Sequence, residues 1–437
     1  MDLIVCIVLM FAALLFTVWS GGQLFFATGF GLALFCIYAL RHGNSPRQLG
    51  AMLMVGVKKA LVVILVLLVI GMLTASWMLC GTIPYLVCLG MKLIHPRLFV
   101  LCAFLLCAAI SFLIGTAFGT ANTMGVVLMT IARGCGVSPA ITAGAILCGI
   151  YVGDRCSPMS SSLLLLSTLT GTDHYTNSRR TLRSCLAPLA LACLCYLPFS
   201  LANPMQGAVS DTAAALGESF CLEPVLLLPV AVMFLLCLCR VPMKKAMLGS
   251  IIAACAVALL VQGVSPLDLP RVLVLGFHLP EGTLAASLIH GGGISSMASG
   301  CLVVLTSCAL AGILEGTHAT ARFESTGREV GLGRYLRTTV TGILTGAIGC
   351  NQTMALVLTE SIRRGAYPDK DEFLQDLSFG GSLGPVLLPW CITVYIPMQS
   401  IGFAGLGYYP YQFWIFLMLL WRALIWAAHA RKSAKAA

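Results

Sequence analysis

The sequence predicts an all-α polytopic membrane protein, and its composition and charge spacing are the observations that predict it. Of the 437 residues, 59% are hydrophobic and only 10% are charged, and the mean hydropathy is +0.96. Soluble domains carry about 25% charged residues. Long runs contain no Asp, Glu, Lys or Arg, among them 60–91, 98–132 and 377–421. Because a spanning helix needs about 20 apolar residues, we expect roughly 10–12 membrane segments, some of them paired or folded back within one run.

Taken in order, the plain apolar runs predict single helices over 3–19, 23–40, 60–79, 184–202, 221–239, 246–263, 295–314 and 408–428. The first run has an acidic flank and lacks the basic flank and cleavage site of a secretory signal, so we expect a retained helix. The 20 cysteines lie mostly in apolar runs and form no CxxC pair, which indicates buried thiols. We expect a single transmembrane domain over 1–437.

Basic residues indicate how the chain is oriented in the bilayer. They gather in the short segments 41–59, 179–183, 240–245 and 431–435, which the positive-inside rule places in the cytoplasm. The segment 203–220 has acids but no Lys or Arg and is expected outside, whereas the basic clusters 322–337 and 363–364 are left unplaced. The net charge of +10 therefore indicates a lipid bilayer as the partner, in a cell (plasma) membrane, and not a nucleic acid.

Two interrupted regions, 98–172 and 335–405, resemble each other. "AFGTANTMGVVLMTIAR" at 117–133 aligns without gaps on "AIGCNQTMALVLTESIR" at 347–363, and each is followed by a Gly/Pro-broken stretch. Paired interruptions in two halves of a membrane protein point to a transporter binding site. The physical reason is that broken helices expose amides and carbonyls, which must face protein, water or a ligand. Whether the two copies are inverted is left open by the sequence.

Asp154, in "GIYVGDRCSPMSSS", is the strongest site candidate. A charge at bilayer depth costs about 2.5–3.5 kcal/mol even on a lenient scale, so an intramembrane acid indicates a functional site with a partner. The alternative is that Arg155 neutralises Asp154 and the pair caps a helix end. Adjacent residues on a helix do not face each other, so that pairing requires a non-helical backbone.

Hydroxyl groups follow directly after this acid, at Ser157, Ser160 and Ser161. Hard cations prefer carboxylate, carbonyl and hydroxyl oxygens, which would make Asp154 a ligand for Na+. The same hydroxyls could instead cap a helix start whose amides hold a carboxylate. From this segment alone, the cation and anion interpretations both stay open.

The aligned turns of the two repeats are expected to be tips of hairpins that enter the membrane and turn back. The polar residues at these tips would line a cavity: Asn122, Thr123, Asn351, Gln352 and Thr353. Plain helix packing by small residues is the alternative. Glu315, Glu360 and Asp376 are expected at solvated or salt-bridged ends, and His290 is expected either to pack or to relay protons.

Several of these stretches resemble one known family. "GIYVGDRCSPMSSS…TGTD", "IGMLTASWMLCGTIPYLVCLG", "GTAFGTANTMGVVLM" and "LGPVLLPWCITVYIPMQS…YYPYQFW" are similar to the NhaC-type sodium/proton antiporters of the ion-transporter superfamily. The likeness runs from about residue 60 to about 420. It implies a secondary antiporter with paired repeats, re-entrant hairpins, broken helices and a midplane site. Asp154 matches the aspartate of the family's Gly-Asp-Lys pattern, and Arg155 takes the place of the lysine.

The chain departs from the family pattern at its acidic positions. Where the family continues Ser-Pro-Leu-Ser-Asp-Thr-Thr-Asn, residues 157–164 read "SPMSSSLL", and 378–382 read "SFGGS" where the family has an acidic pair. Asp154 is then the one carboxylate left in the implied site. Two close carboxylates let protons compete with sodium, whereas a lone carboxylate beside an arginine gives up its proton more readily. Coupling would then use another group, such as His290, or the substrate would differ.

The resulting prediction is a Na+/H+ antiporter that works by alternating access. The alternative is a cation-coupled transporter or exchanger of a small organic carboxylate or amino acid, because arginine and half-helix starts suit carboxylates. The coupling ions Na+ and/or H+ are expected in place of any cofactor, and a homodimer is compatible with such a chain. No enzyme is expected: Tyr151 breaks the Gly-x-Gly-Asp protease pattern, and no Gly-x-Ser-Gly or HExxH motif occurs.

Overall fold

The computed structural model describes residues 3–20, 22–205, 216–239, 241–279, 286, 289–317 and 329–436. The segment 203–220 expected outside therefore lies largely beyond the described residues, as does the side chain of His290. The chain begins with three helices, α1 (Leu3–Trp19), α2 (Leu24–Arg41) and α3 (Pro46–Leu79). Ser45 starts α3 with a reciprocal cap: its side chain accepts from the Gln48 N–H, and the Gln48 side chain accepts from the Ser45 N–H.

The first interrupted region is a series of short and long helices. It comprises α4 (Thr82–Leu93), η1 (Pro96–Leu98), α5 (Phe99–Ile114), α6 (Ala117–Thr120), the π-helical η2 (Ala121–Gly125), α7 (Val126–Gly134), α8 (Pro139–Cys156), α9 (Ser161–Thr170) and α10 (His174–Ala202). The Asp173 carboxylate caps α10 by accepting from the Thr176 N–H at 2.8 Å.

The middle of the chain holds η3 (Pro224–Leu227), α12 (Leu228–Leu238), α13 (Met243–Leu260), α14 (Asp268–Leu275), β1 (Phe277–His278), β2 (His290–Gly291), α16 (Gly293–Ser296) and α17 (Ala298–Gly316). The strands β1 and β2 pair antiparallel and are the only strands in the described part of the chain. The α17 helix lies against α3 at a distance that glycine permits, because a Cβ at Gly56 would lie 2.1 Å from the Cys308 carbonyl oxygen. Small residues of this kind let membrane helices approach closely.

The second interrupted region and the C-terminal helix complete the fold. They comprise α18 (Gly331–Gly349), α19 (Gln352–Arg363), η5 (Arg364–Ala366), α20 (Lys370–Asp376), the π-helical η6 (Leu377–Gly381), η7 (Gly384–Leu387), α21 (Ile392–Ser400), η8 (Tyr409–Tyr411) and α22 (Phe413–Ala436). Each plain helix expected from the apolar runs is present, with ends shifted and α3 and α10 extended at their starts.

The helices confirm an all-α polytopic membrane protein. Five described helical segments are long and apolar enough to cross a membrane, namely Leu24–Arg41, Pro46–Leu79, Pro96–Ile114, His174–Ala202 and Ala298–Gly316. One further candidate span is broken: the segments Lys370–Leu387 and Ile392–Ser400 meet at 54°. This break lies in the second interrupted region, where the sequence predicted broken helices.

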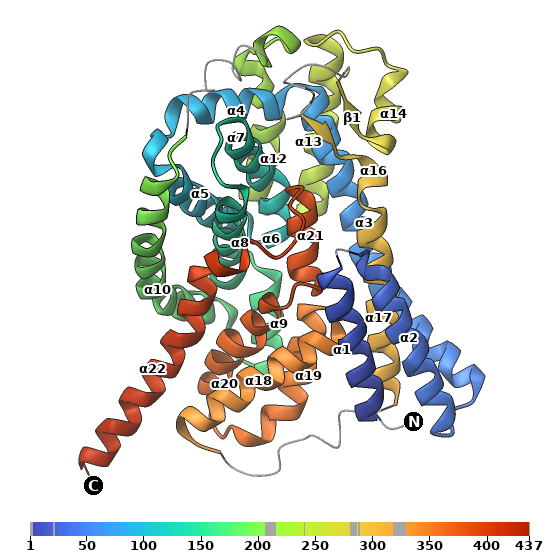
Figure 1. The fold of residues 1–437 in the computed structure, drawn as a ribbon, viewed down its shortest axis with the longest axis vertical. Helices are drawn as coiled ribbons and strands as arrows, with labels where there is room; N and C mark the ends of the chain where they lie inside the picture. The colour runs from blue at the N-terminus through green and yellow to red at the C-terminus, as the bar shows by residue number, and fades with distance from the viewer. Residues whose placement is uncertain are drawn as a thin grey trace.

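The helices α7 and α19, which end the two aligned stretches of the repeats, lie toward opposite ends of the molecule. In Figure 1, α7 lies beside α4 in the upper part, whereas α18, α19 and α20 lie in the lower part. The lower end also holds the C-terminal end of α22, so the basic segments 334–337 and 363–364 lie at the same end as 431–435. Positions at opposite ends are those expected of inverted repeats, and inversion stays a prediction.

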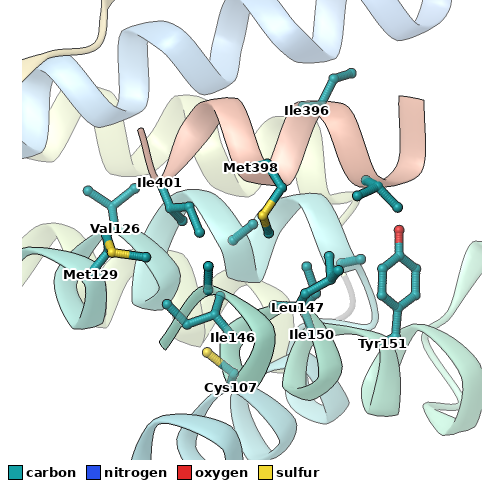
Figure 2. Packing of buried hydrophobic residues seen from close by; sticks show 14 of the residues in the cluster. Cys107, Val126, Met129, Ile146, Leu147, Ile150, Tyr151, Ile396, Met398 and Ile401 are labelled. Atoms are coloured by element: carbon teal, nitrogen blue, oxygen red, sulfur yellow. The ribbon is translucent and has the colours of Figure 1, made fainter. Parts of the chain in front are cut away.

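The α21 helix joins the repeats by packing across helices of the first one. Figure 2 shows Met398 and Ile401 on this segment facing Ile146 and neighbouring apolar side chains of α8, whereas Ile396 points to the opposite side of α21. All of these residues are buried. The second-repeat break is therefore held against the helix that carries Asp154.

Glu315, Glu360 and Asp376, the three acids expected at solvated or salt-bridged ends, all form ion pairs. Glu315 pairs with Lys59, and Glu360 pairs with Arg364, each at 2.7 Å. Asp376 is fully buried, and its carboxylate accepts from Arg422 Nε at 2.7 Å as well as from Tyr367 and Trp426. Because Arg422 and Trp426 lie on α22 and Asp376 lies in α20, this acid ties α22 to α20.

Candidate transport site

Asp154 lies in the last turn of α8, where that helix packs closely on α5. A Cβ at Gly153 would lie 2.0 Å from the Ser111 carbonyl carbon, so only glycine permits this approach. The chain then leaves the helix, and the Ser160 hydroxyl donates to the Asp154 carbonyl while capping α9 through the Leu163 N–H at 3.1 Å. The break therefore fixes the backbone on both sides of the aspartate.

The Asp154 carboxylate faces the starts of two helices. Its nearby donors are the Ala117 N–H, at the start of α6, and the Ser162 hydroxyl, in the first turn of α9. Asp154 is only 6% exposed and forms no ion pair with any described residue. First-turn N–H groups have no partner within their own helix and carry a partial positive charge. These dipoles stabilise the carboxylate without neutralising it.

Asp154 opens onto a cavity of about 430 Å³ in which four helix starts meet. The lining includes Thr116–Gly119 at α6, Ser161 and Ser162 at α9, Asn351–Thr353 at α19, and Ile392 with Thr393 at α21. These starts come from the breaks of both repeats. The paired interruptions in the sequence thus line a single cavity, which is where a site is expected in duplicated transporter halves.

Local hydrogen bonds hold the second-repeat starts in place. Asn351 caps α19 by accepting from the Thr353 N–H at 2.9 Å, and the Gln352 amide donates to the Ser382 hydroxyl at 2.8 Å. The Ile392 N–H donates to the Cys350 carbonyl at 2.9 Å, which links α21 to the turn before α19. The α18–α19 turn is therefore the tip of a helical hairpin whose end lies at the cavity.

The cavity gathers half of the residues predicted from the sequence. Asp154, Ser161, Asn351, Gln352 and Thr353 all line it. No cluster of three or more His, Cys, Asp or Glu side chains occurs among the described residues. A cation here would therefore be held by one carboxylate together with hydroxyl and amide oxygens, which suits Na+ better than a transition metal.

Arg155 lies on another side of α8 and does not line the cavity. Its Nε donates to the Ser378 carbonyl at 3.3 Å, and its guanidinium lies 4.0 Å from the centre of the Phe379 ring. Neither terminal nitrogen has a hydrogen-bond partner among the described residues. The geometry corrects the alternative in which Arg155 neutralises Asp154.

Ser157 and Ser160 serve the backbone of the break. Ser157 is fully buried, and its hydroxyl accepts from the Met159 N–H at 3.1 Å. Ser160 acts as the cap of α9 described above. Neither residue is part of the cavity lining, so their predicted role in binding becomes a role in shaping the break.

Asn122 and Thr123 lie one turn beyond the cavity, in the π-helical η2. The Asn122 amide donates to the Phe118 carbonyl at 2.7 Å, and the Thr123 hydroxyl donates to the Gly119 carbonyl at 2.8 Å. Asn122 lines a separate cavity of about 220 Å³ with Gln399 and Ser296. The two predicted hairpin tips therefore differ, because the first-repeat helix begins five residues earlier in the alignment, at Ala117.

The sequence analysis missed several lining residues. Thr116 caps α6 directly after a glycine, and Thr393 lies in the first turn of α21 after a Pro-Trp pair. Glycine and proline indicate a break in each case but do not indicate which neighbouring residue faces a cavity. Lys244 and the α3 residues Val62 and Val66 also line the cavity. Nothing in an apolar helix or a basic loop marks such residues, because their role depends on distant contacts.

The chain matches a known family and is similar to several curated proteins. The model of the "Na+/H+ antiporter family" matches residues 1–197 and 149–426. The chain is 26% identical to the malate-2H(+)/Na(+)-lactate antiporter of Bacillus subtilis, over 89% of this chain and 86% of that protein. It is also 26% identical to the Na(+)/H(+) antiporter NhaC of Alkalihalophilus pseudofirmus, over 83% and 81%.

A third relative has an organic substrate in its name. The arginine/ornithine antiporter ArcD of Halobacterium salinarum is 27% identical, over 80% of this chain and 75% of that protein. All three relatives are named as antiporters, and the matched family is one of transporters and not of enzymes, in agreement with the broken helices of both repeats. The chain therefore belongs to the Na+/H+ antiporter family and is a multi-pass secondary active transporter.

Proposed function

We propose that the cavity around Asp154 is the transport site and that it exchanges Na+ for protons by alternating access. The observation that carries this proposal is a buried carboxylate, without an ion-pair partner among the described residues, at the meeting point of the breaks of both repeats. One carboxylate binds either a proton or a cation, so the two compete for it. The hydroxyls of Ser161, Ser162 and Thr353 supply further oxygen ligands of the kind that Na+ prefers.

This mechanism needs only the coupling ions, Na+ and H+, and no organic cofactor. Gathering of basic segments at one end of the molecule supports a plasma-membrane orientation with that end in the cytoplasm. Because the cavity is formed within one chain, each copy in a homodimer would carry its own site.

Proteoliposomes that enclose a pH-sensitive dye test the exchange. A pulse of external Na+ should raise the internal pH in vesicles that contain the wild-type protein, and Asp154→Asn should abolish this change. Asp173→Asn is the matched control, because asparagine caps a helix as well as aspartate does and Asp173 lies outside the cavity. Wild-type exchange by Asp154→Asn would remove this residue from the mechanism.

A second candidate is an exchanger of a small organic carboxylate or amino acid at the same site. Four helix starts direct partial positive charge into the cavity, which favours a carboxylate ligand. A volume of about 430 Å³ is also within the range of small-molecule sites, about 300–1,000 Å³. The names of the malate/lactate and arginine/ornithine relatives are consistent with organic solutes on this scaffold.

The two candidates differ in what the vesicles must contain. Sodium/proton exchange requires no organic solute, whereas the second candidate requires one inside or outside before protons move. Adding single carboxylates and amino acids to otherwise identical vesicles, and following uptake of the radiolabelled compound, separates them.

A further inference from the structure

The cavity contains one acidic and one basic side chain among its described lining residues. These are Asp154 and Lys244. They form no ion pair with each other, and the Lys244 ammonium lies 3.4 Å from the Val62 carbonyl oxygen. Two opposite charges that share a cavity without pairing can each bind the complementary charge of one ligand. A site of this kind matches a ligand with a positive and a negative group.

The N-terminal turns of helices around the cavity favour binding of the ligand's negative group. The carboxylate of Asp154 already faces the starts of α6 and α9 through Ala117 and Ser162. The starts of α19 and α21 reach the same cavity at Asn351–Thr353 and at Ile392–Thr393. Their first-turn N–H groups favour a carboxylate, and they add to the charge of Lys244.

Much of the remaining lining is apolar and lies on α3 and α13, while Tyr151 of α8 adds a ring whose hydroxyl donates to the Thr393 carbonyl. Val62, Val66 and Ile70 come from α3, and Met247 comes from α13. A bare cation gains nothing from such a surface, because hard cations bind oxygen ligands. Small-molecule sites, in contrast, are mostly apolar with a few placed polar groups. The apolar surface therefore indicates that the ligand carries a hydrocarbon group.

From these three features we propose that the carried solute is a zwitterionic α-amino acid with an apolar side chain. Its ammonium binds Asp154, its carboxylate binds Lys244 and the start of α19, and its side chain packs on the α3–α13 surface. The proposal rests on the proposed function, since it takes this cavity as the transport site. Because Asp154 holds one cation at a time, the ammonium group displaces a proton or Na+, and displacement of this kind produces exchange.

The charges of the cavity discriminate against related solutes. A dicarboxylate would bring a second negative charge toward Asp154, and a diamine would bring a second positive charge toward Lys244. Like charges that approach within a few ångströms repel each other. An amino acid with an uncharged side chain avoids both penalties.

Binding of radiolabelled L-leucine to the purified full-length protein in nanodiscs tests the proposal. Two competitors are matched to it: 2-hydroxy-4-methylpentanoate lacks the ammonium group, and 3-methylbutylamine lacks the carboxylate. A charged hydrogen bond contributes about 1.5–3 kcal/mol, so each competitor should bind about 10- to 100-fold more weakly than leucine. Lys244→Met should weaken leucine binding by a similar factor, whereas Lys245→Met, outside the cavity lining, should not.

The outcomes separate this inference from the proposed function. Equal competition by the hydroxy acid, or wild-type leucine affinity in Lys244→Met, would refute the proposal that the solute is a zwitterion. Absence of leucine binding in a protein whose Na+-driven proton exchange needs Asp154 would refute the zwitterionic solute but would still support Na+/H+ exchange at this site. Leucine binding without any Na+-driven proton exchange would retain the substrate class and refute Na+/H+ exchange. A thermal unfolding midpoint equal to that of the wild type shows that Lys244→Met is folded.

Discussion

Replacing Gly153 by alanine should force α8 away from α5 directly beside Asp154. The added Cβ would lie 2.0 Å from the Ser111 carbonyl carbon and 2.2 Å from the Phe112 nitrogen. Ordinary contacts begin near 3.4 Å, so the two helices would have to separate locally by about 1.4 Å. Both obstacles are backbone atoms, and a rotamer change cannot relieve them.

The expected cost is at the upper end of the overpacking range, about 3 kcal/mol. Thermal unfolding of the purified variant in detergent measures the loss of stability, and Na+-driven proton exchange in vesicles measures the effect on the site. Gly50→Ala in α3 is the matched control, because nothing lies within 4 Å of its added Cβ. In a helix interior, alanine is favoured over glycine by up to about 1 kcal/mol, so this control should unfold at an equal or higher temperature.

Wild-type stability and wild-type exchange in Gly153→Ala would refute the packing described for this pair of helices. Loss of exchange with unchanged stability would instead mean that the separation reaches the site but is tolerated by the fold. A variant that fails to fold is compared with Gly153→Ser, whose Cβ meets the same backbone atoms, and both should fail together.

Three further substitutions test other contacts. Asp376→Asn leaves the Arg422 guanidinium without its buried anionic partner and should reduce the free energy of unfolding by about 3–5 kcal/mol, as measured by chemical denaturation. Glu329 lies outside the spanning helices, and Arg363 and Arg337 lower its pKa from 4.5 to about 2. The ionised carboxylate therefore stabilises the fold above pH 4.5, and this stabilisation is lost as the pH falls toward 2. Glu329→Gln should remove this part of the dependence of the unfolding free energy on pH, as measured by acid unfolding. Arg155→Met should keep Na+-driven exchange, because this side chain is not part of the cavity lining, and loss of exchange in a folded variant would contradict its placement.

The candidate site could be predicted from the sequence because a charged residue in an apolar run is recognisable from local composition alone. A lone acid in an apolar run, beside glycine, proline and serine, marks a break wherever it lies in space. Asn351–Thr353 could be predicted in the same way, because these polar residues lie in an apolar region of the second repeat and align with 121–123 of the first. These features depend on local composition, which a sequence states directly.

Other parts of the site depend on geometry that composition does not record. Arg155 follows Asp154 in the chain, but adjacent helical residues point about 100° apart, so it faces Phe379 and not the cavity. Asn122 aligns with Gln352, yet the π-helical turn and the earlier helix start move it to a different cavity. Lys244 comes from a helix that packs near the site only in the folded molecule.

The central claim is that Asp154 is the carboxylate on which the transported cation and the proton compete. Titration calorimetry of Na+ binding to the purified protein, in buffers of different ionisation enthalpy and between pH 5 and 9, measures the protons released per bound ion. The account predicts up to about one proton released from the wild type and from Asp173→Asn, and none from Asp154→Asn. Equal proton release by Asp154→Asn and the wild type would contradict the account.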